Sequence, residues 1–116
     1  MRLGKIRLLA LVLAALSLAA CGAKVPEIAR DLPTNYAAGE KVFDARLKAK
    51  FPAGADVRTL AGTLEAQGFT VRTDDRGGDA SFSDKRFPVA NVWIINWEAK
   101  DGRLMRIWGI YGGRGP

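Results

Sequence analysis

Apolar residues recur with a helical period at the start of the segment that we predict to be a folded domain. In residues 40–51, Phe43, Leu47 and Phe51 recur every four positions. Positions four apart lie on one side of a helix, so this spacing predicts a helix with one buried face. Pro52 follows directly and ends it.

A second helix is expected over residues 57–67. Its apolar residues recur at intervals of three and four, and they are Val57, Leu60, Ala61 and Leu64. Asp56 is a suitable N-cap, because its carboxylate can accept from the unpaired N–H groups of the first turn. Gly68 suits the left-handed position just past the end.

After Gly68 the period changes from helix to strand. Residues 69–73 alternate as a strand, 74–79 form a polar turn, 80–83 suggest a short strand and 84–88 a loop. Residues 91–99 and 104–111 are rich in strand formers and flank Asp101-Gly102, a strong hairpin signal. Residues 112–116 are expected to fray.

The predicted fold class is therefore α+β, with two N-terminal helices packed on a three- to four-stranded antiparallel sheet over residues 37–116. A two-residue turn at Asp101-Gly102 would pair Trp97 with Arg106, Ile95 with Trp108 and Trp93 with Ile110. The three tryptophans would then share one face. A three-residue turn would shift the pairing by one and flip the partner strand. The sequence leaves both registers open, and in either one both sheet faces carry large apolar groups, of which the helices can cover only one.

The first twenty residues have the layout of a secretory leader. Arg2, Lys5 and Arg7 precede the apolar run 8–20, which is too short for an ordinary membrane span. The junction Leu18-Ala19-Ala20-Cys21 resembles a bacterial lipobox. This resemblance implies a diacylglycerol thioether on Cys21, cleavage before it and attachment to a membrane, since two or three acyl chains anchor firmly. The alternative is an ordinary signal peptide with a coincidental cysteine.

The residues after Cys21 bear on location and tethering. Gly22 stands where an aspartate would favour inner-membrane retention in enterobacteria, so outer-membrane sorting, facing the periplasm, is expected. Residues 22–36 contain Pro26 and Pro33 and no periodic apolar stripe, which favours a flexible tether. An N-terminal arm packed on the domain is the alternative.

Composition narrows the function classes. The formal charge is +6, but the three cations of the leader would be lost with it, which leaves +3. This balance favours anionic headgroups or acidic partners and gives no support for nucleic-acid binding. The chain has no histidine and one cysteine, so it offers neither a Ser–His or Cys–His pair nor a usual zinc set. No catalytic residue, metal site or cofactor is expected. The turn carboxylates are read as solvated, because their spacing does not fit a calcium loop; they are Asp74, Asp75, Asp79 and Asp84.

Tryptophan and arginine near the hairpin are the candidate partner-binding residues, because both types are enriched at interaction hot spots. They are Trp93, Trp97, Trp108, Arg103 and Arg106. The alternative is that the tryptophans form the core of a domain without disulfides. Basic residues could face anionic headgroups or form a scattered solvated surface; they are Lys85, Arg86, Arg103, Arg106 and Arg114.

The order of lipobox, tether, two helices and strand meander resembles the SmpA/BamE family, the small lipoproteins of the bacterial β-barrel assembly machinery. The matching features are the lipobox 18–21, the helix–turn–helix 40–67 and Gly68-Phe69 entering the first strand. The resemblance implies a helix pair on an antiparallel sheet. No segment matches that family's partner-binding loop, so no binding residues carry over. The expected function is a non-catalytic structural or protein-interaction module of the cell envelope, with an inhibitor or small-ligand-binding lipoprotein as the alternative.

Overall fold

The computed structural model describes residues 24–84 and 89–114. The predicted leader 1–20, the predicted lipidation site Cys21, and the basic residues Lys85 and Arg86 lie outside these residues. Within the described part, no helix is both long and apolar enough to cross a membrane.

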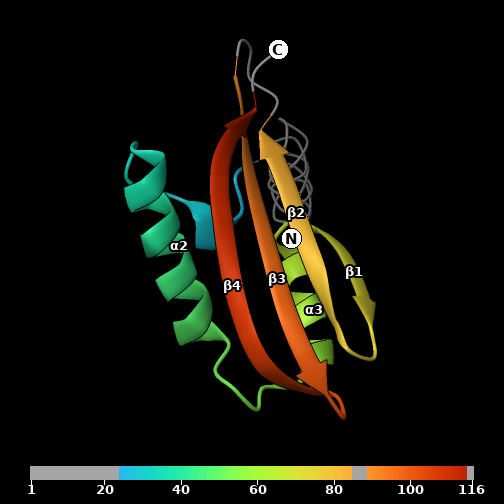
Figure 1. The fold of residues 1–116 in the computed structure, drawn as a ribbon. Helices are drawn as coiled ribbons and strands as arrows, with labels where there is room; N and C mark the ends of the chain where they lie inside the picture. The colour runs from blue at the N-terminus through green and yellow to red at the C-terminus, as the bar shows by residue number, and fades with distance from the viewer. Residues whose placement is uncertain (1–23, 85–88, 115–116) are drawn as a thin grey trace, which may run out of the picture.

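The described chain forms an α+β fold, as predicted (Figure 1). A short 3-10 turn, η1 (Glu27–Ala29), precedes the helices α2 (Tyr36–Lys50) and α3 (Val57–Ala66). Four strands follow: β1 (Thr70–Asp74), β2 (Gly77–Asp84), β3 (Ala90–Lys100) and β4 (Arg103–Arg114). They form one antiparallel sheet in the order β1-β2-β3-β4. The helices precede the sheet in the chain but follow an arm of residues 24–35, so they are not at the N-terminus of the described part.

The helix termini follow local capping chemistry. Helix α2 begins four residues before the predicted start, because the Asn35 side chain accepts a hydrogen bond from the Ala38 N–H at 3.0 Å. The predicted stripe of Phe43, Leu47 and Phe51 is buried. Helix α3 has the predicted N-cap, with the Asp56 carboxylate accepting from the Arg58 N–H at 2.8 Å.

Strand β2 is longer than the predicted segment 80–83. It begins at Gly77, and Gly77 and Gly78 pair with both β1 and β3. The turn before it is held by the Asp74 carboxylate, which accepts from the N–H groups of Arg76 and Gly77. The prediction of a polar turn over 74–79 was therefore wrong for residues 77–79, which belong to β2. Glycine suits this part of β2, because a side chain of the neighbouring strand β3 lies across it. The indole of Trp97 lies against Gly78, where a Cβ would come within 2.5 Å of it.

The β3–β4 hairpin has the two-residue turn, one of the two alternatives that the sequence left open. Neither of the two predicted registers describes the strand pairing over its whole length. Asp101 and Gly102 both have positive φ, which suits the tight hairpin turn. Lys100 then pairs with Arg103. A β-bulge opposite Glu98 shifts the pairing of the residues beyond it by one position, so that Trp97 pairs with Ile107. Strand β4 also continues through Gly112 and Gly113 to Arg114, residues that were expected to fray.

The bulge decides which side chains of β4 face the helices. Beyond it, Ile107, Gly109 and Tyr111 lie on the helix side with Trp93, Ile95 and Trp97 of β3. Gly109 lets α2 approach closely, since a Cβ there would lie 2.7 Å from both Phe43 and Leu47. A row of stacked and edge-on rings crosses this side of the sheet; in order it is Phe69, Phe82, Trp93, Tyr111 and Tyr36.

The arm of residues 24–35 packs on the domain. Pro26 is fully buried, and Ile28 and Ala29 belong to the core. The Ile28 N–H donates to Gln67 Oε1 at 3.0 Å, and the Arg46 guanidinium donates to the carbonyls of Ile28 and Arg30 at 3.3 and 2.5 Å. In the described part of segment 22–36, the structure therefore has the packed arm and not a free tether, because apolar burial and these hydrogen bonds hold it.

Candidate interaction surface

One face of the sheet is uncovered by any described element (Figure 1). Helices α2 and α3 and the arm pack on the other side, where the core lies. Alternation along β3 directs Val92, Ile94 and Asn96 away from that core, since Trp93, Ile95 and Trp97 point into it. We call the uncovered side the open face. Its cross-strand rows, read from β1 to β4, are Thr70–Ser81–Ile94–Ile110, Arg72–Asp79–Asn96–Trp108 and Asp74–Gly77–Glu98–Arg106, and Ser83–Val92–Gly112 form a further row.

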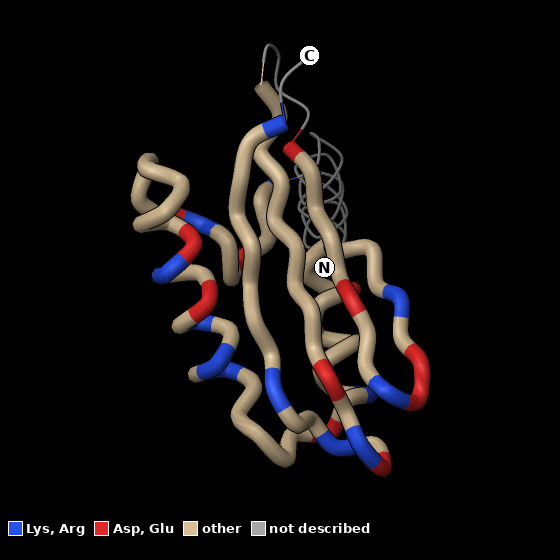
Figure 2. Tube along the Cα trace, in the orientation of Figure 1, with Lys and Arg blue, Asp and Glu red and all other residues tan. Residues whose placement is uncertain are grey.

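The centre of the open face is apolar and aromatic. Ile94 is directly opposite Ile110, and Ile110 is 41% exposed. Trp108 is half-buried, and the Arg106 guanidinium lies over its ring at 4.6 Å. Figure 2 shows that the middle parts of β3 and β4 carry no charged residue, whereas charges gather toward the strand ends. An exposed apolar centre of this kind favours contact with another molecule.

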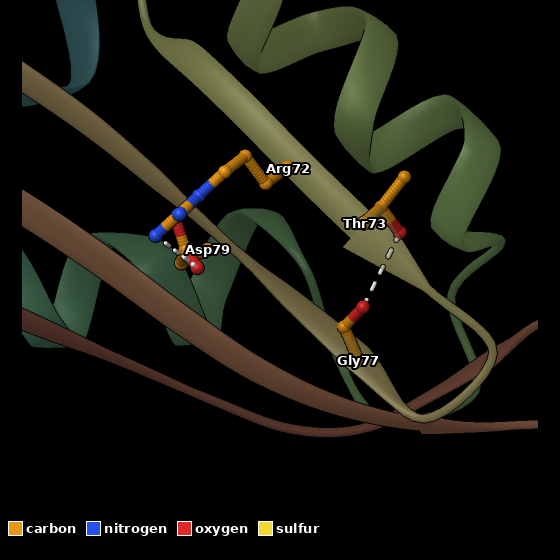
Figure 3. A network of polar contacts seen from close by, with 4 residues as sticks. All are labelled: Arg72, Thr73, Gly77 and Asp79. Atoms are coloured by element: carbon orange, nitrogen blue, oxygen red, sulfur yellow. Dashed lines mark hydrogen bonds and ion pairs between the residues drawn. The ribbon is translucent and has the colours of Figure 1, made fainter.

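Ion pairs border this apolar centre. Arg72 of β1 reaches across to β2, where its Nε and Nη2 atoms donate to the two Asp79 carboxylate oxygens at 3.2 Å each (Figure 3). In the same hairpin the Thr73 hydroxyl donates to the Gly77 carbonyl at 3.3 Å. Arg106 pairs with Glu98 at 2.9 Å. Exposed ion pairs of this kind contribute little to stability, about 0–1 kcal/mol each. A partner that binds these arginines in place of the carboxylates therefore costs the fold little free energy.

The three predicted tryptophans divide between the two faces. Trp93 and Trp97 are 4% and 3% exposed and belong to the core, so a partner-binding role does not suit them in this fold. Trp108 lies on the opposite, open face with Arg106. The physical reason is the bulge, which the sequence pattern did not reveal. Arg103 is exposed at the hairpin, where it lies opposite Lys100 in the strand pairing.

The basic residues do not form one surface. Arg103 and Arg106 lie near the Asp101-Gly102 turn, whereas Arg114 ends β4 at the opposite end of the sheet. Lys85 and Arg86 fall outside the described residues.

Two carboxylates of the predicted polar turn have structural partners. Asp74 caps the β1–β2 turn, and Asp79 pairs with Arg72. Across residues 24–84 and 89–114, no group of three or more His, Cys, Asp or Glu residues is placed to hold a metal ion. On the helix side of the sheet, burial and the nearby Tyr36 and Asp84 raise the pKa of Tyr111 above 10.0, so its hydroxyl stays protonated at neutral pH.

A hollow of about 570 Å³ separates the arm from the end of the sheet. It is lined by both apolar and charged side chains, among them Lys24, Leu32, Asp84, Trp93 and Tyr111. The buried Nε1 atoms of Trp93 and Trp97 have no hydrogen-bond partner. A buried N–H donor without a partner is costly. Sequence reasoning did not find this hollow, because it is formed only when the arm packs.

Comparison with protein-family models, with curated proteins and with solved structures finds no match to this chain. The functional argument therefore depends on the residues and geometry described above.

Proposed function

We propose that this chain is a lipid-anchored protein of the bacterial cell envelope that binds another envelope protein through the open face of its sheet. It works without catalysis, as a structural or accessory module. The lipobox 18–21 supports attachment through Cys21, and Gly22 supports the outer membrane, facing the periplasm, as its location.

The observation that carries the binding role is the composition of the open face. It combines a half-buried tryptophan, an arginine stacked on it and the paired Ile94 and Ile110, with ion pairs at the border. Aromatic and arginine anchors in an apolar centre with a polar border are the usual anatomy of a protein interface.

Position-specific photo-crosslinking in intact envelopes tests this role. A photoreactive amino acid replaces Ile110 on the open face or, as a control, Met105, which is 56% exposed near the hairpin and the Pro52–Ala53 turn. We expect a discrete adduct from position 110 that is absent from position 105. Trp108→Ala in the position-110 protein should remove most of that adduct. Adducts that are the same at both positions, or that persist with Trp108→Ala, would contradict the open face as the binding surface.

A small-ligand-binding role is the second candidate, and the hollow beside the arm is the observation that favours it. Its volume falls within the usual range of ligand pockets, about 300–1,000 Å³, and both apolar and charged side chains line it. A ligand that binds in this hollow should raise the melting temperature of the wild type, and should raise it less when the lining residue Leu32 is changed to alanine. The absence of any shift across a panel of small polar and amphipathic ligands would count against this role.

A further inference from the structure

The packed arm places the proposed lipid anchor close to the folded domain. Lys24 is the first described residue, and it lines the hollow beside the sheet. Cys21 precedes it by three residues, and three residues of chain reach at most about 10 Å. A free tether from residue 22 to residue 36 would have reached several times farther. The point of attachment is therefore fixed, within about 10 Å, to one place on the domain.

That place is one end of the sheet. The hollow that holds Lys24 is also lined by Asp84, the last residue of β2, and by Asn91, with which Asp84 pairs at the start of β3. Ala90 in turn pairs with Arg114, the last residue of β4. This is the end to which the β2 and β4 arrows point in Figure 1. We call it the anchor end.

The anchor end carries exposed residues that suit a lipid headgroup layer. Tyr36 and Val89 are 39% and 42% exposed, and they are two of the four exposed large apolar residues of the described chain. They lie together, since a Cβ at Gly113 would be 2.5 Å from the Tyr36 hydroxyl and 3.0 Å from Val89 Cγ1. The Tyr36 hydroxyl donates to Asn91 Oδ1 at 2.8 Å. Tyrosine is enriched at membrane interfaces, where its ring is buried among headgroups and its hydroxyl stays hydrated.

Charge at this end adds a small attraction to anionic lipid. Lys24, Arg30 and Arg114 are exposed there, against the acidic Asp31 and Asp84 of the same hollow. Each cation near an anionic surface adds to the attraction. Because two carboxylates offset much of this, the orientation depends mainly on the short connection to the anchor and on the apolar contacts.

We propose that the anchor end faces the lipid surface and that the strands stand away from it. This inference rests on the proposed lipidation of Cys21. Strand β3 has eleven residues, so the Asp101-Gly102 hairpin lies about 35 Å from the anchor end. The open face is then directed parallel to the membrane plane, toward the soluble parts of neighbouring membrane proteins and not toward the lipid.

Fluorescence quenching in vesicles tests this orientation. Because the chain has one cysteine and lipidation occupies it, a second cysteine can be labelled selectively. Full-length lipidated Val89→Cys and Met105→Cys proteins carry the same fluorophore in phosphatidylcholine–phosphatidylserine vesicles with headgroup-labelled quencher lipid. We expect severalfold stronger quenching at position 89 than at position 105, which lies nine residues before Arg114 along β4. Arg46→Ala in the Val89→Cys protein should weaken the quenching, because release of the arm lengthens the connection.

The outcomes separate this inference from the proposed function. Lipidated protein that is quenched equally at positions 89 and 105, or more at 105, would overturn the orientation and leave the lipid anchor intact. An intact mass with unmodified Cys21 would overturn the anchor, and the orientation with it. Loss of the contrast in pure phosphatidylcholine would show that charge sets the orientation, and would overturn the role of the short connection.

Discussion

The side chain of Asp44 on α2 covers the free edge of β4 by accepting a hydrogen bond from the backbone N–H of Gly109 at 3.0 Å. One helical turn earlier, Glu40 accepts from the Tyr111 N–H at 3.1 Å. Nearer the hairpin, the loop after α2 covers the same edge of β4. The Gly54 N–H donates to the Leu104 carbonyl there, and the Leu104 N–H donates to the Ala55 carbonyl. An uncovered edge strand invites pairing with other chains. Helix α2 and this loop therefore close one edge of the sheet while its open face stays accessible.

Removing the Asp44 carboxylate should destabilise the domain. Asp44→Ala leaves the Gly109 N–H without its partner and loses the ion pair with Lys48. Because Asp44 is partly exposed, we expect a loss of about 1 kcal/mol in the free energy of unfolding, measured by urea denaturation. Asp44→Asn, which keeps an acceptor oxygen, should lose less. Equal stability of the alanine variant and the wild type would show that water replaces this bond without cost.

The contribution of Asp44 should depend on pH. Burial by itself would raise the pKa of this carboxyl, but the hydrogen bonds from Lys48 and from the Gly109 N–H outweigh burial and hold the pKa below 3.8. A carboxyl whose pKa is lower in the folded state stabilises the fold above its unfolded pKa, and this is lost as pH falls through the folded value. The stability difference between wild type and Asp44→Asn should therefore be constant near neutrality and shrink below about pH 4. A difference that grows on acidification would contradict this sign.

Close contact between α2 and β4 makes Gly109 sensitive to a single methyl group. Gly109→Ala should cost about 1–3 kcal/mol, because its Cβ would meet both Phe43 and Leu47 at 2.7 Å. Gly62 in α3 is the matched control, since a Cβ there meets nothing within 4 Å. Gly62→Ala should raise stability by about 0.5–1 kcal/mol through helix propensity. Thermal unfolding of both proteins measures the two effects, and a tolerated Gly109→Ala would mean that α2 can move away at little cost.

Release of the arm should follow from loss of the Arg46 side chain. Its guanidinium bonds the carbonyls of Ile28 and Arg30 and so holds the arm on α2. Arg46→Ala should lower the free energy of local opening by about 1.5–3 kcal/mol. Cleavage by trypsin after Arg30 should then become roughly tenfold faster or more, since each 1.4 kcal/mol is a factor of ten. Arg58→Ala serves as the control and should leave the rate unchanged. The same rate in both variants would mean that apolar burial alone holds the arm.

Trp93 and Trp108 should differ in their effect on stability. Trp93→Ala removes a core ring that stacks on Tyr111 at 5.2 Å, so a loss of about 3–5 kcal/mol is expected. Trp108→Ala removes a half-exposed ring from the open face and should cost about 1 kcal/mol or less. Denaturation followed by far-ultraviolet circular dichroism compares them. A large loss for Trp108→Ala would place this residue among the structural determinants and weaken its use as a binding probe.

Much of the fold follows from short segments of the sequence. The spacing of Phe43 and Leu47, the cap at Asp56, the left-handed Gly68 and the Asp101-Gly102 turn each depend on contacts within a few residues. Local hydrogen bonds and the spacing of apolar side chains are set by residues close together in the sequence, so these elements could be predicted. The early start of α2 was also within reach, because Asn35 is a good N-cap residue that the prediction did not use.

The candidate site could not be predicted to the same depth, because distant parts of the chain decide it. Without the bulge, Arg106 would face the core opposite Trp97, and Trp108 would meet α2 where Gly109 now lies. Burial of an unpaired charge and overpacking both cost free energy, so tertiary packing favours the shifted register. Likewise, the arm packs because Arg46 and Gln67 bond it from elements far along the chain. The sequence by itself determined the two helices, the hairpin turn and the leader pattern, whereas only the tertiary structure decided which tryptophan is exposed and how the arm packs.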